Sequence, residues 1–172
     1  MRAGKRCKIS LIVSPVELPL LLISNGIFID YINSLKLDNL TIASPDMGGA
    51  KRAKNYAGHL GAEVVIAYKE RKKANVIEEM FLIGDVKDRN VILIDDMIDT
   101  ANTLCQAATA LKEQGADKVL AYATHPVLSG EAVKRINASI IDNVVVTDTI
   151  PLSENAKKSK KIKQISISGV LA

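Results

Sequence analysis

Short apolar runs alternate along the chain with longer stretches in which apolar residues recur every three or four positions. The apolar runs predict strands at residues 40–43, 63–67, 80–84, 91–94, 118–124, 143–147 and 162–167. The periodic stretches predict helices at residues 28–37, 50–60, 104–112 and 131–138. Because strands and helices alternate, we expect an α/β fold built on a mainly parallel sheet with helices on both faces.

The N-terminal part of the chain has the weakest pattern, and residues 1–14 are the least readable. Pro15 and Pro19 argue against a regular helix across residues 1–23, because proline lacks the N–H that a helix interior needs. A length of 172 residues suits one α/β domain with its own core, and the chain contains no internal repeat. We therefore interpret residues 1–172 as a single domain.

The stretch of residues 91–103 combines a buried strand with two kinds of polar group. Asp95 and Asp96 follow the apolar run, at the carboxyl end of a strand, where open α/β sheets bind their ligands. Residues 99–103 then offer hydroxyls, small side chains and backbone amides at the start of a helix, an arrangement that suits a phosphate. The two acids would repel a phosphate and are better suited to ribose hydroxyls or to a divalent metal. A phosphorylated sugar would satisfy both parts of the stretch.

A plainer interpretation of the same stretch uses no ligand. Asp99 or Thr100 would cap the following helix, and Asp95 and Asp96 would be ordinary polar residues at the end of a strand.

Three further polar loops follow predicted strands. Residues 44–49 read Ser-Pro-Asp-Met-Gly-Gly, residues 69–75 carry a cluster of charges, and residues 125–130 begin with His125. Taken alone, the first loop is typical of a turn and the second of a solvated loop. A single histidine at a strand end, such as His125, is typically structural. Because the carboxyl ends of parallel strands meet at one edge of a sheet, we expect all three loops to converge with residues 95–103.

Composition narrows the classes of function. No apolar run reaches the roughly 20 residues that span a bilayer, so we expect no membrane association. The net charge of +4 is concentrated in two terminal clusters, and aromatics make up only 3%, which argues against nucleic-acid binding. Cys7 and Cys105 are too few for a disulfide framework, so we expect reduced thiols and a cytoplasmic location.

Residues 91–103 resemble, almost residue for residue, the phosphoribosyl-pyrophosphate-binding loop of type I phosphoribosyltransferases. They resemble even more closely that of ribose-phosphate pyrophosphokinases (phosphoribosyl-pyrophosphate synthetases). Residues 44–49 match the Ser-Pro-Asp-x-Gly-Gly signature of this second family, including Arg52 as the basic residue that follows.

The charged cluster is also similar to that family. Lys69 and Arg71 match the first and third positions of its Lys-Arg-Arg triplet on a mobile catalytic loop, whereas Glu70 differs from the middle arginine. Further matches lie at residues 123–126, 129–130 and 146–151, so the resemblance runs from about residue 15 to residue 172.

The resemblance implies a type I phosphoribosyltransferase-like fold and a role in nucleotide biosynthesis. The family transfers the β,γ-pyrophosphoryl group of ATP to the 1-hydroxyl of ribose 5-phosphate, with magnesium (Mg2+). It also implies a homo-oligomer. By position, Asp46 would help to hold the magnesium ion, and Lys69 and Arg71 would be catalytic. Asp95 and Asp96 would face the ribose. The residues that would bind the 5-phosphate are Asp99, Thr100, Ala101, Asn102 and Thr103.

Two departures keep alternatives open. Family members are roughly twice as long, and this chain resembles their C-terminal half; the Arg-Gln-Asp motif and magnesium-binding histidine of the N-terminal, ATP-binding half are not found. The family also usually has glycine at the position of Asn102. The chain is therefore expected to be a pyrophosphokinase or its ribose-phosphate-binding half. The alternatives are a non-catalytic regulatory or scaffold subunit and a type I phosphoribosyltransferase that acts on a base.

Overall fold

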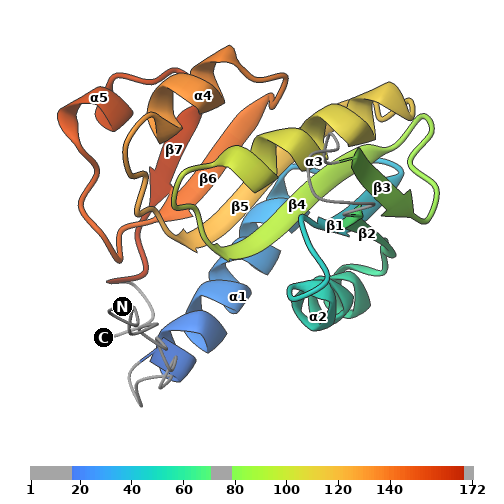
Figure 1. Ribbon diagram of the computed structural model, residues 1–172. Coiled ribbons are helices and arrows are strands. Elements are labelled where there is room, and N and C mark those ends of the chain that lie inside the picture. The colour runs from blue at the N-terminus through green and yellow to red at the C-terminus, as the bar shows by residue number, and fades with distance from the viewer. Residues whose placement is uncertain (1–16, 71–78, 169–172) are drawn as a thin grey trace, which may run out of the picture.

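A computed structural model describes residues 17–70 and 79–168 of the chain (Figure 1). Its helices are α1 (Glu17–Ser34), α2 (Ala50–Leu60), α3 (Asn102–Glu113), α4 (Ala132–Ala138) and α5 (Glu154–Lys157). Its strands are β1 (Leu40–Ser44), β2 (Glu63–Glu70), β3 (Glu79–Ile83), β4 (Asn90–Met97), β5 (Lys118–His125), β6 (Asn143–Thr147) and β7 (Ile162–Ile165). No helix in these two ranges is long and apolar enough to cross a membrane.

The described strands form one seven-stranded sheet in the order β3-β2-β1-β4-β5-β6-β7. All neighbouring pairs are parallel except β2 and β3, which are antiparallel at one edge. The chain adds β2 and β3 on one side of β1, and then returns to add β4 and the later strands on the other side. The strand order therefore reverses between β1 and β4, and ligands of open α/β sheets bind at such a switch point.

Helices cover both faces of the sheet, as the sequence predicts (Figure 1). On one face, Phe28 and Ile32 of α1 and Tyr56 of α2 pack against the sheet residues Ile42 and Ile92. On the other face, α3, α4 and α5 bury apolar side chains against the same strands. The expected α/β class, with a mainly parallel sheet, is confirmed.

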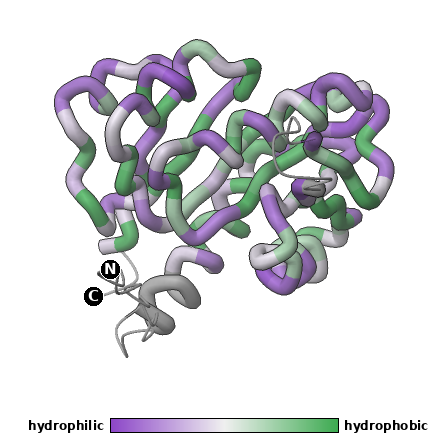
Figure 2. The backbone as a smooth tube through the Cα atoms, in the orientation of Figure 1, coloured by the Kyte–Doolittle hydropathy of each residue, from purple (hydrophilic) through white to green (hydrophobic). Residues whose placement is uncertain are grey.

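The central strand β4 shows why its apolar run is continuous. Val91, Ile92, Leu93 and Ile94 are all buried. Val91 and Leu93 belong to the core under α3, whereas Ile92 and Ile94 belong to the core under α1 and α2. A strand covered on both faces needs apolar residues at every position. Figure 2 shows the hydrophobic residues gathered in the central strands and the hydrophilic residues along the outer helices and loops.

Several predicted elements agree with the structure. The helix at 50–60 and the strand at 143–147 have the predicted bounds. Gly61 ends α2 with a left-handed backbone (φ 62°) and donates its N–H to the Ala57 carbonyl, a common way to end a helix.

Other boundaries were wrong. Helix α1 begins at Glu17 and contains Pro19, which was expected to prevent a regular helix in this part of the chain. Pro19 lies in the first turn, where its missing N–H leaves no helical hydrogen bond unmade. Strand β2 extends to Glu70, so Lys69 is part of a strand rather than of a loop. The short helix α5 was not predicted.

Candidate functional site

The loop after β1 and the loop after β4 enclose a cavity of about 170 Å³. These strands are the two neighbours at which the strand order reverses. The residues that line the cavity are Asp46, Asp95, Met97, Ile98, Asp99, Thr100, Ala101, Asn102, Thr103 and Leu104. Most of the residues selected from the sequence for metal and sugar-phosphate binding are thus brought together, although 49 positions separate Asp46 from Asp95 in the chain.

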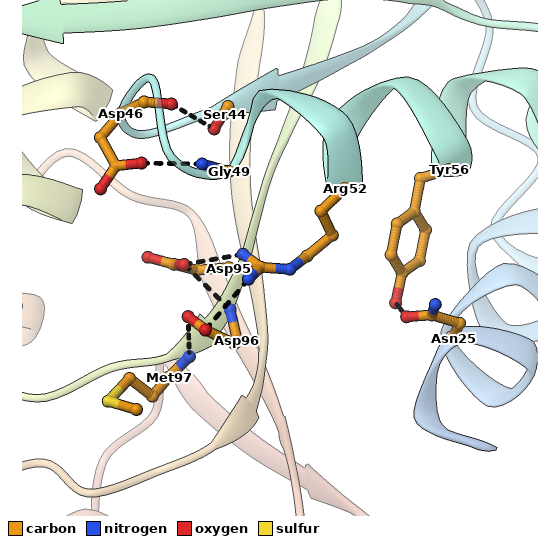
Figure 3. A network of polar contacts seen from close by, with 9 residues as sticks. All are labelled: Asn25, Ser44, Asp46, Gly49, Arg52, Tyr56, Asp95, Asp96 and Met97. Carbon is orange, nitrogen blue, oxygen red and sulfur yellow. Dashed lines mark hydrogen bonds and ion pairs between the residues drawn. The ribbon is translucent and has the colours of Figure 1, made fainter. Parts of the chain in front are cut away.

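The loop after β1 is a tight turn that fixes Asp46 (Figure 3). The hydroxyl of Ser44 donates to the backbone carbonyl of Asp46 at 2.6 Å, and the Gly49 N–H donates to Asp46 Oδ1 at 2.9 Å. A Cβ on Gly49 would lie only 2.5 Å from Ser44 Oγ. The glycine is therefore needed for a close approach between two parts of the same loop.

Asp95 and Asp96 share one arginine (Figure 3). Arg52, in the first turn of α2, places Nη1 3.0 Å from Asp95 Oδ1 and Nη2 3.0 Å from Asp96 Oδ2. Each carboxylate also accepts the N–H of the next residue, from Asp96 at 2.9 Å and from Met97 at 3.0 Å. Both acids lie within β4, which continues to Met97, rather than beyond its end as predicted.

The paired acids differ in their affinity for protons. Burial raises the pKa of Asp95 to about 7, and the Asp96 carboxyl beside it adds to this shift. For Asp96, burial acts in the same direction, but the hydrogen bond with Asp95 and the charge of Arg52 hold its pKa below the usual range. Two adjacent carboxyls that face one guanidinium cannot both ionise easily, so Asp95 binds a proton more readily than Asp96 does.

The loop between β4 and α3, residues 98–101 (the β4–α3 loop), enters the helix in an unusual conformation. Ala101 is the N-cap of α3 and has a left-handed backbone (φ 59°), and no side chain makes a capping hydrogen bond there. The carboxylate of Asp99 instead accepts a hydrogen bond from Ser129 Oγ. Capping of α3 by Asp99 or Thr100 is therefore wrong. Asn102, the position at which the family usually has glycine, is the first helical residue.

The loop after β5 supports the β4–α3 loop from the side. The N–H of Ile98 donates to the His125 carbonyl at 3.0 Å, and the N–H of Leu128 donates back to the Ile98 carbonyl at 2.8 Å. The ring of His125 contacts Thr149 Oγ1 at 3.0 Å, which agrees with the structural role expected for this histidine. From α4, Arg135 Nη1 donates to the carbonyl of Thr100.

Lys69 lies apart from this cavity. It pairs with Met80 near the end of β2 and lines a second cavity of about 410 Å³ between β3 and α3, together with Phe81 and Gln106. It is at the same edge of the sheet as the β4–α3 loop, because β1, β2 and β4 are parallel. Arg71, the second predicted catalytic residue, lies outside the described residues.

Sequence reasoning missed three contributors to the site. Arg52 and Ser129 were noted only as parts of stretches that match the family, and Arg135 was not selected at all. Their partners are 43, 30 and 35 positions away in the chain, and no local pattern links residues at such separations.

A metal ion would find only a partial set of ligands here. Within residues 17–70 and 79–168, no three acidic, histidine or cysteine side chains are grouped so that they could hold a metal ion. Magnesium is commonly held by one or two carboxylates together with substrate phosphates and water. The exposed carboxylate of Asp46, fixed at the cavity by Gly49, fits that single-ligand role.

Comparisons with known sequences bear on the same region. A family described as the phosphoribosyl synthetase-associated domain matches residues 67–172. A ribose-phosphate pyrophosphokinase from Neisseria meningitidis is 57% identical over 146 residues, which are 85% of this chain and 45% of that protein. A ribose-phosphate pyrophosphokinase from Helicobacter pylori is 53% identical over the same share of each chain. The chain thus spans a little under half of the length of these curated relatives.

Comparisons with solved structures support the fold. A phosphoribosylpyrophosphate synthetase from Mycobacterium smegmatis matches with a TM-score of 0.78 and 33% identity, over 86% of this chain and 48% of that one. An adenine phosphoribosyl transferase from Trypanosoma brucei, solved with AMP, pyrophosphate and ribose-5-phosphate, matches with a TM-score of 0.58 and 20% identity. That match covers 88% of this chain and 75% of that one, and at this identity it supports the fold alone.

Proposed function

The chain belongs to the ribose-phosphate pyrophosphokinase family, and on that premise we propose that it carries the ribose 5-phosphate half of a pyrophosphokinase site. The whole reaction converts ATP and ribose 5-phosphate to AMP and 5-phosphoribosyl 1-pyrophosphate, a precursor for nucleotide biosynthesis. The observation that carries the proposal is the cavity at the switch point. It joins Asp46 and Asp95 to the start of α3, so that groups suited to a sugar and to a phosphate line the same space.

The sugar phosphate would bind along this cavity. Its 5-phosphate would lie against residues 99–103, where the first N–H groups of α3 have no partner within the helix and the helix dipole favours negative charge. The carboxylates of Asp95 and Asp96 would accept hydrogen bonds from ribose hydroxyls. Arg52 would keep the two acids in place and reduce their repulsion of the anionic ligand.

The transfer step needs orientation and charge neutralisation more than covalent catalysis. The oxygen of the ribose 1-hydroxyl would attack the β-phosphorus of ATP and release its proton to solvent. The bond from the β-phosphorus to the oxygen that it shares with the α-phosphorus would break, and AMP would leave with that oxygen. Lys69 and Arg71 would neutralise the charge on the transferring group. Magnesium, held by Asp46 and the phosphates, would supply further neutralisation when bound.

Several finer assignments are also part of the proposal. Most contacts to the adenine nucleotide would come from the half of the relatives that this chain does not match. We infer a cytoplasmic location, because an enzyme of nucleotide biosynthesis acts where nucleotides are made. We also infer a homo-oligomer, because the family resemblance implies one. A phosphoribosyltransferase that acts on a base is less well supported, because the likeness to that class rests on fold alone.

Calorimetry with ribose 5-phosphate tests the binding half of the proposal. Asp95→Ala and Thr103→Ala should each weaken binding about tenfold, because each removes a hydrogen bond to the ligand. Lys54→Ala, on the exposed surface of α2, serves as the control and should bind as the unaltered chain does. Unchanged affinity in both site variants would contradict the assignment.

Formation of AMP from ATP, ribose 5-phosphate and magnesium tests the catalytic half. AMP that depends on ribose 5-phosphate and is lost in Lys69→Ala would identify the chain as an enzyme by itself. Sugar-phosphate binding without AMP would identify it as the ribose-phosphate-binding half. Release of pyrophosphate from 5-phosphoribosyl 1-pyrophosphate and a purine base would instead favour a phosphoribosyltransferase.

A further inference from the structure

Three consecutive carbonyls of the β4–α3 loop are held by one neighbouring segment. The carbonyl of Ile98 accepts the N–H of Leu128 at 2.8 Å, and the carbonyl of Asp99 accepts the N–H of Ser129 at 3.0 Å. The carbonyl of Thr100 accepts a hydrogen bond from the guanidinium of Arg135. All three donors belong to residues 128–135, which run from the loop after β5 into α4 (the bracing segment).

This arrangement determines where the N–H groups of the loop point. In a trans peptide the carbonyl and the following N–H point in opposite directions, and the described residues contain no cis peptide. Carbonyls drawn toward the bracing segment therefore turn the N–H groups of Asp99, Thr100 and Ala101 away from it. Within residues 17–70 and 79–168, none of these three N–H groups donates a hydrogen bond. Successive N–H groups directed to one side form a concave site for anions.

The loop has little within itself that would keep this orientation. Ala101 occupies a left-handed conformation that alanine disfavours, and no side chain caps α3. A flip of the peptide between Thr100 and Ala101 would weaken the binding of a phosphate, because it would turn a carbonyl oxygen toward the anion. The restraint against that flip comes from Arg135.

Arg135 acts from outside the cavity. It lines a separate hollow with Asn102, Cys105 and Ser139, and it is not among the residues that line the cavity of Asp46 and Asp95. Its effect on a ligand would therefore pass through the Thr100 carbonyl rather than through direct contact.

We propose that Arg135 is a positioning residue, which holds the Thr100 carbonyl back so that the loop N–H groups face the 5-phosphate of ribose 5-phosphate. This inference rests on the proposed function, since it requires a phosphate in the cavity. Ser129 acts in the same way on Asp99, but its backbone N–H would remain in a Ser129→Ala variant, so the larger effect belongs to Arg135.

Calorimetry on the full chain with ribose 5-phosphate and with inorganic phosphate tests the inference. Arg135→Met keeps most of the side-chain length but removes the donor, and it should weaken binding of both ligands about tenfold. Arg135→Lys retains a donor and should recover part of the loss. Lys134→Met, at the adjacent exposed lysine that pairs with Glu131, is the matched control and should bind as the unaltered chain does.

A second readout separates positioning from general destabilisation. In amide NMR spectra, addition of ribose 5-phosphate to the unaltered chain should shift the N–H signal of Ala101, and this shift should be lost in Arg135→Met while the signals of β5 and β6 remain unchanged. If the unaltered chain binds ribose 5-phosphate and Arg135→Met binds it with equal affinity, the inference is overturned and the proposed function stands. Absence of binding by the unaltered, folded chain would overturn both.

Discussion

At Gly49 a single missing atom decides whether the loop after β1 can close. The backbone of Gly49 is not left-handed, so conformational freedom is not the reason for glycine there. The reason is space, because Ser44 Oγ occupies the place of a Cβ. The hydroxyl cannot move away without breaking its bond to the Asp46 carbonyl.

We expect Gly49→Ala to lower the free energy of unfolding by about 1–3 kcal/mol, as overpacking does in a tight site. Gly58→Ala is the control, because nothing lies within 4 Å of its added Cβ, and alanine inside α2 should stabilise by about 0.5–1 kcal/mol. Urea denaturation measures both. Equal effects of the two substitutions would contradict the steric account.

The acid pair makes stability depend on pH through Asp95. Burial raises its pKa from 3.8 to about 7, so between these values the folded chain holds a proton that the unfolded chain releases. The free energy of unfolding should therefore fall as pH rises through that window. Asp95→Asn mimics the protonated form and should match the unaltered chain near pH 3, below both pKa values, but exceed its melting temperature at pH 8. Asp30→Asn, at an exposed site on α1, should show no such divergence.

At this scale, residue type and position after a strand were sufficient to select Asp95 and residues 99–103 from the sequence, whereas Asp46 was selected through the family resemblance. The same reasoning could not select Arg52, because its contact depends on how closely α2 approaches β4. It also gave no indication of the left-handed backbone at Ala101, since alanine rarely adopts that conformation.

Among the elements, α2 and β4 are joined at the edge of the site by the two ion pairs of Arg52. Arg52 comes from the first turns of α2, and its two partners lie side by side near the end of β4. A helix that covers one face of the sheet therefore also fixes groups at the sheet edge. This connection links the loop of Asp46, which leads directly into α2, to the acids of β4.

Arg52→Met should destabilise the chain by about 1–3 kcal/mol at pH 8, because it leaves two adjacent, partly buried carboxylates without a counter-charge. The loss should shrink at pH 5, where Asp95 is protonated. The double variant Arg52→Met with Asp95→Asn should recover part of the stability. Lys51→Met, at the exposed neighbouring position, is the control. A loss that is the same at both pH values would argue against an electrostatic cause.

Element type was predicted better than element length. Apolar runs identified β1, β4, β5 and β6 because these strands are buried on both faces. The polar ends of β2 and β4 were assigned to loops, since backbone pairing with a neighbouring strand continues past the last apolar residue. Proline in a first helical turn and a helix as short as α5 have equally weak signals.

For the whole molecule, the alternation of strands and helices predicted the layers but not the order of the strands. The reversal between β1 and β4 arises from pairings between strands that are distant in sequence, and the antiparallel edge strand β3 arises in the same way. The convergence of the loops that follow β1, β4 and β5 was predicted from the parallel arrangement alone, and most of residues 69–75 lie outside the described residues. The position of the cavity between β1 and β4 could not be predicted in this way, because it depends on the order of the strands.

A ligand that bridges both sides of the switch point should stabilise the whole domain. At a ribose 5-phosphate concentration of 100 times Kd, linkage adds about 2.7 kcal/mol, which is roughly 5–10 °C in Tm for a domain of this size. Ribose without a phosphate should shift Tm much less, because it lacks the group that contacts the start of α3. Differential scanning calorimetry measures both, and equal shifts for the two sugars would contradict the assigned phosphate position.

The contact between Arg135 and the carbonyl of Thr100 also determines when the site is completed during synthesis of the chain. These residues are 35 positions apart, so a ribosome makes the β4–α3 loop about 2–7 s before the side chain that restrains it. A growing chain can already contain both acids and the start of α3 while the Thr100 peptide is still free to turn. Capture of a phosphorylated sugar at full affinity therefore waits for the synthesis of α4, and metabolite in the surrounding medium stabilises the earlier, incomplete forms less.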